Sequence, residues 1–272
     1  MIDIGTEFIP NCDIARKTLA PRGYASSVFS TYSNAYVITN EDLRTSMSFM
    51  PPKCEKALVV AGSGDHPLFC SLYGAKHVDA FDISYNAKCI TDIKVAALKV
   101  IDNKDAYWNL IRGLYSSENV MWVKKMGYIL NNLSSVVADY IWNLQESPLF
   151  IQGRQPEYNA QNAPTESEYQ ALRQIVKKPY NFIISDITHL WPQLKYDYDF
   201  MHLSNVCDYF SKAERVDNIL PLLNYVNVGG KILMNDQLHC GTQQACEYIA
   251  KNNPVWKYSH PCDGINILTR TR

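Results

Sequence analysis

The chain has 272 residues, of which 47% are hydrophobic, so it has enough apolar side chains for a large folded domain, and global disorder is not expected. Its 26 basic and 27 acidic residues leave a net charge of −1, which argues against a protein that binds nucleic acid mainly through phosphate contacts. The eight cysteines form no C-x-x-C pair, and no histidine lies at zinc-finger spacing from a pair of cysteines. This pattern predicts reduced thiols, a cytoplasmic location and no metal site.

Residues 1–53 are expected to form an N-terminal arm. They lack the pattern of a signal peptide, and the whole chain lacks a run of about 20 apolar residues that could span a bilayer. Thr39 or Asn40 is a candidate cap for a short helix from Leu43 to Met50. The arm either packs on the sheet or closes over a ligand, and three residues are candidates for the second role: Tyr32, Asn34 and Tyr36.

A strand, a glycine turn, a short helix and a second strand follow the arm. The apolar run Ala57–Ala61 is typical of a buried parallel strand, and Gly62-Ser63-Gly64 lets the backbone bend sharply. Pro67 is tolerated in the first turn of a helix. The second strand, Val78–Phe81, ends in Asp82, at the edge where an open α/β sheet binds its ligands. An acid in this position can accept hydrogen bonds from both hydroxyls of a ribose.

A helical region follows the second strand. Apolar residues three and four apart predict a helix over Ser84–Ile101. Residues 105–178 then interrupt the alternation: an apolar stripe predicts one helix over Val120–Gln145, and the capping-box sequence Thr165-Glu166-Ser167-Glu168 begins another, to about Val176. We expect a mainly helical insertion, which either extends the core or forms a lid that shapes an acceptor pocket.

Strands and helices alternate again from Tyr180 onwards. The third strand ends in Asp186 and the fourth, Tyr198–Leu203, ends in Ser204-Asn205. The remaining expected elements are a helix over Lys212–Val226, a tight turn at Asn227–Gly230, a strand over Lys231–Met234, a helix over Thr242–Lys251, and a hairpin of Val255–Ser259 with Ile265–Thr269.

This order of elements predicts an α/β fold. The sheet should be doubly wound, mostly parallel and Rossmann-like, with a terminal antiparallel hairpin. The arm of residues 1–53 precedes this domain, which spans residues 54–272 and contains the helical insertion at about 105–178.

The glycine turn separates two classes of nucleotide. The dinucleotide fingerprint G-x-G-x-x-G needs a third glycine where this chain has Pro67, which disfavours NAD or FAD. S-adenosylmethionine (SAM) has no phosphate; it needs a glycine turn, an acid for the ribose and a polar residue for the adenine. Gly62 with Gly64, then Asp82, then Asp186 occupy these places in order. The pattern therefore predicts SAM as the cofactor.

With these residues, the chain resembles the class I SAM-dependent methyltransferases. Their sheet has a reversed strand at its edge, and Gly229-Gly230 is similar to their turn before the fifth strand. Asp82-Ile83-Ser84, followed by Asp92-Ile93-Lys94-Val95-Ala96-Ala97-Leu98, also resembles a group of bacterial SAM-binding proteins allied to the betaine-lipid 3-amino-3-carboxypropyl transferases.

The chain also departs from these families. Ser84 replaces an asparagine of the second group, Val60 stands where methyltransferases often have an acid, and His66 stands at their third glycine. The resemblance therefore specifies the fold more closely than the reaction.

The resemblance implies roles for particular residues. Asp82 would bind the ribose, and Gly62 and Gly64 would shape the turn. Asp65 would hold the SAM ammonium or cap a helix, and Asp186 would lie near the adenine amine or cap the segment at Thr188. The other predicted cofactor contacts are Ser63, Ile83, Ile187 and Tyr36.

The predicted catalytic residues follow the fourth strand: Ser204, Asn205 and Asp208. Methyl transfer needs positioning more than acid–base chemistry, but a weak nucleophile needs a base. Asp208 is better placed for this than His202, which lies in a strand pattern and is more often a core residue. The Asn/Asp-Pro-Pro-Tyr motif of amino-group methyltransferases is absent.

These observations favour a SAM-dependent transferase that methylates a small-molecule acceptor, with no nucleic-acid partner. Fold analogy alone favours methyl transfer. The alternatives are 3-amino-3-carboxypropyl transfer from SAM, a non-catalytic protein that binds SAM or a nucleoside, and an NAD-linked oxidoreductase.

Overall fold

The computed structural model describes residues 8–18, 30–114, 123–144, 160–177, 180–236 and 241–272. They fall into two compact units. Unit 1 draws on residues 1–41, 62–65 and 82–178, and unit 2 on residues 42–61, 66–81 and 179–272.

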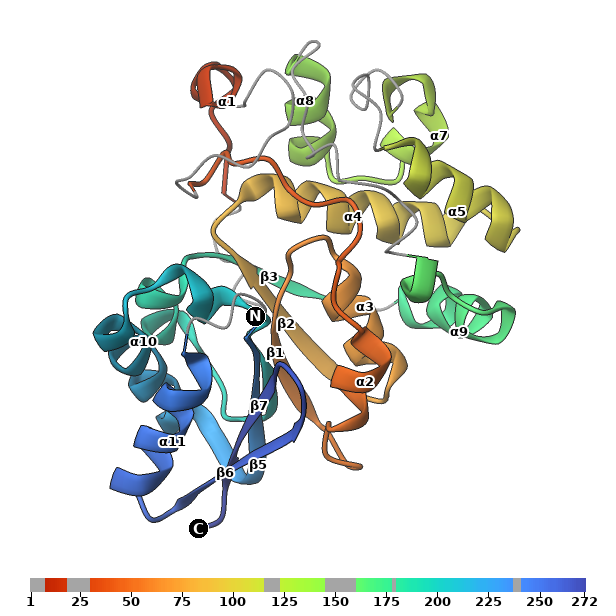
Figure 1. Ribbon diagram of the computed structural model, residues 1–272. Coiled ribbons are helices and arrows are strands. Elements are labelled where there is room, and N and C mark those ends of the chain that lie inside the picture. The colour runs from red at the N-terminus through yellow and green to blue at the C-terminus, as the bar shows by residue number, and fades with distance from the viewer. Residues whose placement is uncertain (1–7, 19–29, 115–122, 145–159, 178–179, 237–240) are drawn as a thin grey trace. The chain divides into compact units, whose positions relative to one another are not determined.

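Unit 2 is built on a seven-stranded sheet with the order β3-β2-β1-β4-β5-β7-β6 (Figure 1). β1 is parallel to β2 and β4, β4 is parallel to β5, and β7 is antiparallel to β5 and β6. This confirms the predicted α/β sheet with its terminal antiparallel hairpin. The strands are β1 (Lys56–Val60), β2 (His77–Asp82), β3 (Asn181–Ile184), β4 (Tyr198–His202), β5 (Val226–Asn235), β6 (Trp256–Cys262) and β7 (Ile265–Arg270).

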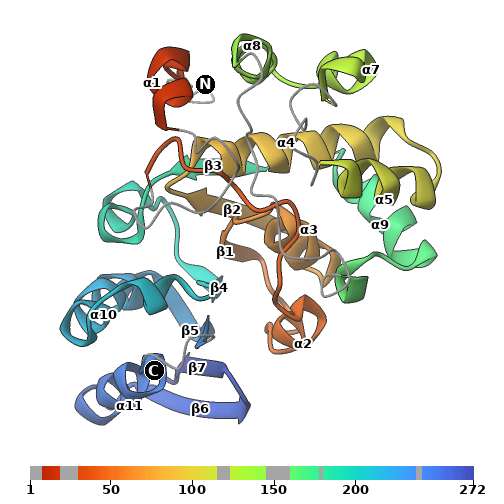
Figure 2. The same ribbon diagram turned by 45° about the horizontal axis from the view of Figure 1, so that its top comes forward.

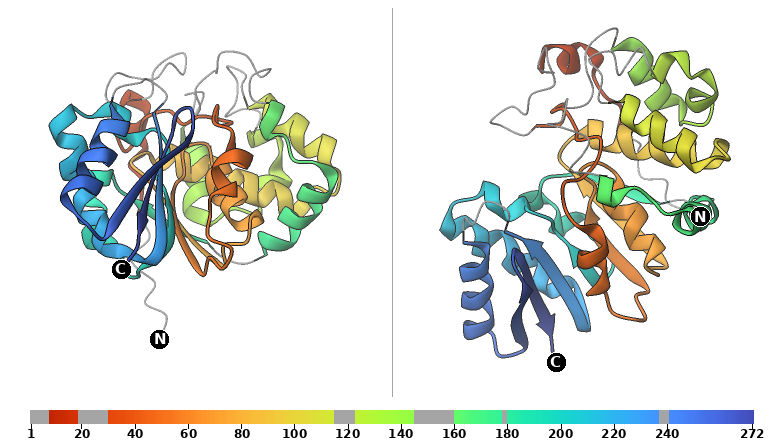
Figure 3. Two further views of the ribbon diagram at one scale, coloured as in Figure 1. Left: turned by 60° about the horizontal axis from the view of Figure 1, so that its bottom comes forward. Right: turned by 45° about the vertical axis from the view of Figure 1, so that its right-hand side comes forward.

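Helices cover both faces of this sheet. In Figure 3, α10 (Lys212–Ile219) and α11 (Thr242–Asn252) lie on one face and α3 (Asp65–Leu72) lies on the other. The sheet is therefore doubly wound, as predicted. Ala57 to Val60 of β1 are all buried, which fits a central parallel strand covered on both faces. The short helix α2 (Leu43–Ser48) precedes β1.

Unit 1 is helical in its described part. Its longest helix, α4 (Tyr85–Val100), contacts α5 (Lys104–Gly113), α7 (Gly127–Leu130) and α9 (Glu166–Ile175) (Figure 2). The remaining helices of this unit are α1 (Cys12–Thr18) and α8 (Ser135–Asn143). Thr165 and Glu168 form the predicted capping box of α9. Whether the insertion acts as a lid stays a prediction.

Within the described ranges, no helix is both long and apolar enough to cross a membrane. The cysteines in these ranges are all free thiols.

The predicted caps of the first short helix are wrong. The N-cap of α2 is Asp42, whose carboxylate accepts hydrogen bonds from the Thr45 amide at 3.2 Å and the Thr45 hydroxyl at 2.6 Å. The backbone N–H of Thr39, one of the two residues predicted as the cap, instead donates to a side chain in the glycine turn.

The single helix predicted over Val120–Gln145 is also wrong. In its described part this stretch forms α7 and α8, and residues 131–134 separate them. The apolar spacing continues across the break, but Ser134 caps α8 by accepting a hydrogen bond from the Val137 amide. The helix α5, for which no expectation was drawn from the sequence, lies just before this stretch.

The expected turn at Asn227–Gly230 lies inside β5. Tyr198 pairs with Val226 but Phe200 pairs with Lys231, so β5 bulges beside β4. Gly229, at the bulge, has φ +82°, which favours glycine. The helix before β5 ends earlier than expected, at Ile219, and a 3-10 helix over Leu220–Tyr225 follows it.

Gly230→Ala should destabilise the sheet. A Cβ at this position would lie 2.8 Å from the carbonyl oxygen of Asn227 and 3.0 Å from that of Tyr198, so the bulge would have to shift. We expect the free energy of unfolding in urea to fall by about 1–3 kcal/mol. The matched control is Gly127→Ala, where a Cβ meets nothing within 4 Å. Equal stability of the two variants would contradict this prediction.

Candidate functional site

The glycine turn follows the end of β1. Gly62 has φ +55° and Gly64 has φ +81°, so both lie in the left-handed region that L side chains avoid. A Cβ on Gly64 would lie 2.8 Å from the Cα of Thr91 on α4. The turn therefore requires glycine at both positions. The requirement is stricter at Gly64, because this residue also packs against α4.

Asp82, the last residue of β2, is hydrogen-bonded to this turn. Its carboxylate accepts from the Gly62 amide at 2.9 Å through Oδ2 and from the Ser84 amide at 2.9 Å through Oδ1. The side chain is half-buried. These two bonds orient the carboxylate toward the glycine turn and the start of α4. Ser84 in turn caps α4 by accepting from the Asn86 amide.

Residues 30–41, which we call the N-terminal strap, are fastened near Asp82 at one end. The carbonyl oxygen of Ser33 accepts hydrogen bonds from the Ser84 hydroxyl at 2.6 Å and from the Asn86 side-chain amide at 2.9 Å. Asn86 is fully buried, and its Oδ1 accepts from the Tyr140 hydroxyl of α8 at 3.0 Å. Asn86 thus joins the strap, α4 and α8.

The strap is fastened to the glycine turn at its other end. The Thr39 amide donates to Oδ2 of Asp65 at 2.9 Å. The side-chain amide of Asn162 donates to the carbonyl oxygens of Thr39 and Glu41 at 3.2 and 2.8 Å. The strap therefore runs from the loop after Asp82 to the glycine turn.

The three strap residues predicted to close over a ligand differ in exposure. Tyr32 and Asn34 are buried, at 9% and 7% exposure, whereas Tyr36 is 43% exposed. The Tyr32 hydroxyl accepts from the Asn11 amide at 2.8 Å, so it has a structural partner. Of the three, Tyr36 presents the most side-chain surface to a ligand.

Asp65 is bonded within the turn and to α4. Besides the Thr39 amide, its carboxylate accepts from the Ser63 hydroxyl at 2.7 Å and forms an ion pair with Lys94. Burial lowers the pKa of Lys94, and the Asp65 charge partly opposes this. These bonds favour a framework role for Asp65 and Ser63 over the predicted contact with the SAM ammonium.

In unit 2, Asp186 follows β3 and caps a short 3-10 helix, Ile187–His189. Its carboxylate accepts from the Thr188 amide at 2.8 Å and from the His189 amide at 3.2 Å. Burial raises the pKa of Asp186, but the hydrogen bonds from Thr188 and His189 outweigh it and hold the pKa below its usual range. Ile187 is 1% exposed within the core of unit 2, so its side chain is not a surface contact.

Ser204 follows β4 in an uncommon conformation. Its φ of +54° makes it the one non-glycine residue with positive φ in the described ranges. Its amide donates to Nδ1 of His202 at 3.2 Å, and its carbonyl oxygen accepts from the Asn235 amide at 2.8 Å. Such a conformation is costly, and it often occurs at functional sites. Asn205 lies next to it, with Oδ1 3.3 Å from the Ser204 hydroxyl.

Asp208, the predicted base, lies in a 3-10 helix over Val206–Tyr209. It is 7% exposed and accepts a hydrogen bond from the Thr242 hydroxyl at 3.3 Å. The adjacent Tyr209 is 49% exposed. The predicted catalytic residues thus follow the carboxyl end of β4, with Ser204 and Asp208 partly engaged in bonds within unit 2.

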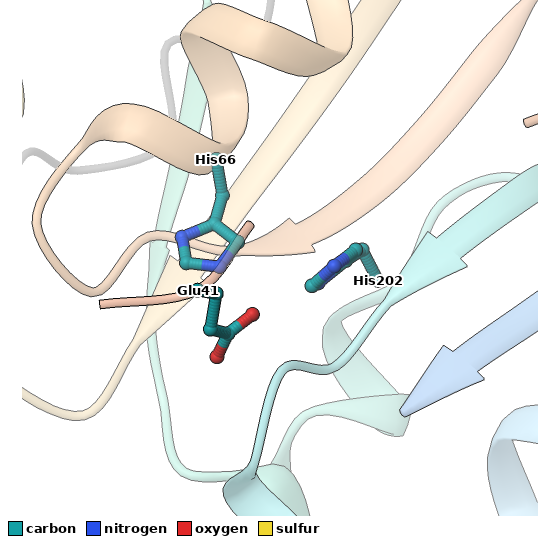
Figure 4. Close-up of side chains that lie close together, drawn as sticks. All are labelled: Glu41, His66 and His202. Carbon is teal, nitrogen blue, oxygen red and sulfur yellow. The ribbon is translucent and has the colours of Figure 1, made fainter. Parts of the chain in front are cut away.

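His202 is a core histidine, as its strand pattern indicated. It is fully buried, and its ring lies 5.0 Å from that of His66, measured between centroids (Figure 4). Because Nδ1 accepts from Ser204, the neutral ring carries its proton on Nε2, an assignment inferred from this bond. His202 therefore orients Ser204. Glu41, also labelled in Figure 4, belongs to unit 1.

Two residues near the glycine turn and Asp82 were missed from the sequence: Lys94 and Asn86. Lys94 lies four residues after Ile90 and three before Ala97, so it shares the buried face of the helix. A lysine on such a face indicates a buried partner, which was the available signal. Asn86 has no comparable signal, because an asparagine in the first turn of a helix is ordinary.

No family model and no curated protein matches the sequence. The structure is similar to a ribosomal protein L11 methylase from Lactobacillus delbrueckii subsp. bulgaricus, with 12% identity, 85% of this chain and 77% of that chain covered, and a TM-score of 0.43. It is similar to the N-methyltransferase NodS from Bradyrhizobium japonicum in complex with S-adenosyl-L-homocysteine, with 9% identity, 84% and 82% coverage, and a TM-score of 0.39. An rRNA methylase from Streptococcus thermophilus shows 11% identity, 86% and 94% coverage, and a TM-score of 0.38.

Asp186→Asn should change the acid sensitivity of the protein. Asp186 has a folded-state pKa below the unfolded value of about 3.9, so its stabilising effect is present above about pH 4 and is lost as the pH falls through the folded pKa. Asparagine caps equally well but does not titrate. In urea unfolding, the native protein should lose more stability between pH 5 and pH 3 than the variant. Asp263→Asn, in an exposed turn, controls for the loss of one carboxylate; parallel curves for native protein and Asp186→Asn would contradict this prediction.

Proposed function

We propose that the chain binds SAM at the glycine turn and Asp82 and transfers the methyl group to a small-molecule acceptor. The observation that carries this proposal is the 2.9 Å hydrogen bond from the Gly62 amide to Asp82. It holds an acid at the end of the second strand against a two-glycine turn at the end of the first. In an open α/β sheet, this is the edge where ligands bind.

The local geometry fits a nucleoside that is joined to an amino acid without a phosphate group. Gly64 leaves no room for a Cβ between the turn and α4, so the backbone of the turn packs directly on that helix. Asp82 would accept hydrogen bonds from the ribose hydroxyls. Tyr36 and Ile83, which are exposed and half-buried respectively, would make the remaining contacts in unit 1.

For the transfer step, we assign roles to the residues after β4. When bound, SAM supplies a methyl group on a positively charged sulfur. After the transfer, the sulfur is part of a neutral thioether, S-adenosylhomocysteine, which is the leaving group. Ser204 and Asn205 would orient the acceptor, and Asp208 would take the proton that the acceptor loses. β4, which these residues follow, pairs with β1 in the sheet of unit 2. Asp186 remains a proposed neighbour of the adenine.

The second candidate function is 3-amino-3-carboxypropyl transfer, suggested by the stretch Asp92 to Leu98. In the structure, however, these residues stabilise α4 and its packing. Lys94 pairs with Asp65, Asp92 pairs with Lys88 at 2.6 Å, and the apolar residues Ile93, Ala96, Ala97 and Leu98 are buried. Because α4 needs these residues for packing, the stretch does not favour either transferred group.

A small acceptor is the simplest partner for this chain. The net charge of −1 does not favour a nucleic acid. The similar structures have names that indicate a ribosomal protein and rRNA among their acceptors, and this variety favours no single class here.

Asp82→Asn should weaken binding of S-adenosylhomocysteine through the ribose. Hydrogen bonds to a charged group are worth about 1.5–3 kcal/mol, so removing the ligand's 2′-hydroxyl should weaken binding to the native protein by about tenfold or more. The same change in the ligand should matter much less to the variant, because the charged acceptor is gone. Calorimetry with both ligands on both proteins measures this coupling.

The matched control is Asp105→Asn, an exposed acid on α5 of the same unit. It should keep the full effect of the 2′-hydroxyl. If Asp82→Asn also keeps it, Asp82 does not bind the ribose.

The product made from SAM should identify the group transferred. Incubation with SAM and a mixture of small metabolites, followed by chromatography, should yield S-adenosylhomocysteine if methyl is transferred. Methylthioadenosine instead would show aminocarboxypropyl transfer. Binding without either product from any acceptor would favour a non-catalytic SAM-binding protein.

A further inference from the structure

We propose that Lys94 is a positioning residue for the cofactor: through its ion pair with Asp65, it holds the glycine turn and the N-terminal strap in the geometry that binds SAM. This inference rests on the proposed function for its ligand. The residues that position the turn all belong to unit 1.

Asp65 joins three parts of unit 1 through one carboxylate. Lys94 of α4 forms an ion pair with this carboxylate. The Thr39 amide of the strap donates a hydrogen bond to it at 2.9 Å, and the Ser63 hydroxyl, in the middle of the glycine turn, donates one at 2.7 Å. Each of these groups is a donor, so the negative charge of Asp65 is what gathers them. The charge of Lys94 is what permits that negative charge to remain in a buried place.

Lys94 is held entirely inside the protein. Its side chain is 1% exposed and that of Asp65 is 12% exposed. An isolated charge in such a place is strongly unfavourable, so the two opposite charges stabilise each other there. Removing Lys94 alone would leave Asp65 buried without its counter-charge.

The turn is also pressed against the same helix one turn earlier. Thr91, three residues before Lys94, lies so close to Gly64 that a Cβ would collide with its backbone. The contact at Thr91 fixes how near the turn lies to α4, and the ion pair at Lys94 fixes its orientation. Together they set the direction of the backbone groups of Gly62 to Gly64, which face the proposed ligand.

An ion pair of this kind is not explained by stability alone. Buried pairs can often be replaced by apolar residues of similar volume without loss of stability, because the cost of desolvating two charges offsets their attraction. Lys94 lies on the buried side of α4 beside apolar residues, including Ile90 and Ala97. A specific geometric requirement at the turn accounts for the charge at this position.

The test compares two ion pairs on the same helix. Asp65→Asn with Lys94→Met removes both charges and keeps an acceptor at residue 65. Asp92→Asn with Lys88→Met does the same to a second ion pair on α4, between Lys88 and Asp92. Hydrogen exchange of the ligand-free proteins reports the order of residues 62–65 and 36–41, and calorimetry reports the affinity for S-adenosylhomocysteine.

For the first double variant we expect at least tenfold faster exchange in the turn and strap, and at least tenfold weaker binding, while exchange in α9 stays as in the native protein. The second double variant should change none of these. A merely structural role would instead speed exchange throughout or leave the turn unaffected.

Native-like exchange in the turn of the first double variant would overturn the proposal, whatever its affinity. If the double variant does not fold, Asp65→Asn alone replaces it, because a buried lysine without a partner can lose its proton. This single variant should show the same faster exchange in the turn and strap. Native-like exchange in it would again overturn the proposal. If the double variant exchanges faster but the native protein binds no S-adenosylhomocysteine, the positioning of the turn by Lys94 is supported and the proposed cofactor is refuted.

Discussion

The carboxylate of Asp82 connects the end of one strand to the turn that follows another. It accepts hydrogen bonds from the Gly62 and Ser84 amides, and Ser84 in turn caps α4 and binds the strap at Ser33. Because Gly62 needs a positive φ, this acid faces a backbone that only glycine adopts easily. The order of unit 1 around the proposed cofactor site depends on this bond, since the turn, the start of α4 and the strap all meet there.

α4 serves as the framework for that site. Its first turn carries Asn86, which binds the strap and α8, its middle presses on Gly64 through Thr91, and Lys94 reaches Asp65. These contacts are made by polar groups that are almost completely shielded from water, so each lost partner would leave an unsatisfied group. This explains why a helix with an apolar core-facing stripe carries an asparagine and a lysine on its buried side.

Much of the fold could be predicted from local sequence. The apolar run before Gly62, the acid after the second strand, the capping box at Thr165 and the Asp263-Gly264 hairpin all depend on short-range preferences. Both errors concern helix boundaries. Asp42 rather than Thr39 caps α2 because the helix begins at Leu43, directly after Asp42, while the Thr39 hydroxyl accepts a hydrogen bond from the Glu41 amide. The apolar stripe across α7 and α8 hid a break, because periodicity does not show where a polar residue will cap a new helix.

By itself, the sequence determined the class of the sheet, the glycine turn, and the acid at the end of the second strand. These follow from strand periodicity, from glycine's access to positive φ and from the polarity of strand ends. Only the tertiary structure decided what the other polar residues do. Asp65 and Asp82 are both acids near a glycine turn, yet one is neutralised inside the protein by Lys94 and the other is half-buried at the turn. The physical reason is that the role of a carboxylate depends on its burial and its partners, and those partners come from segments distant in sequence.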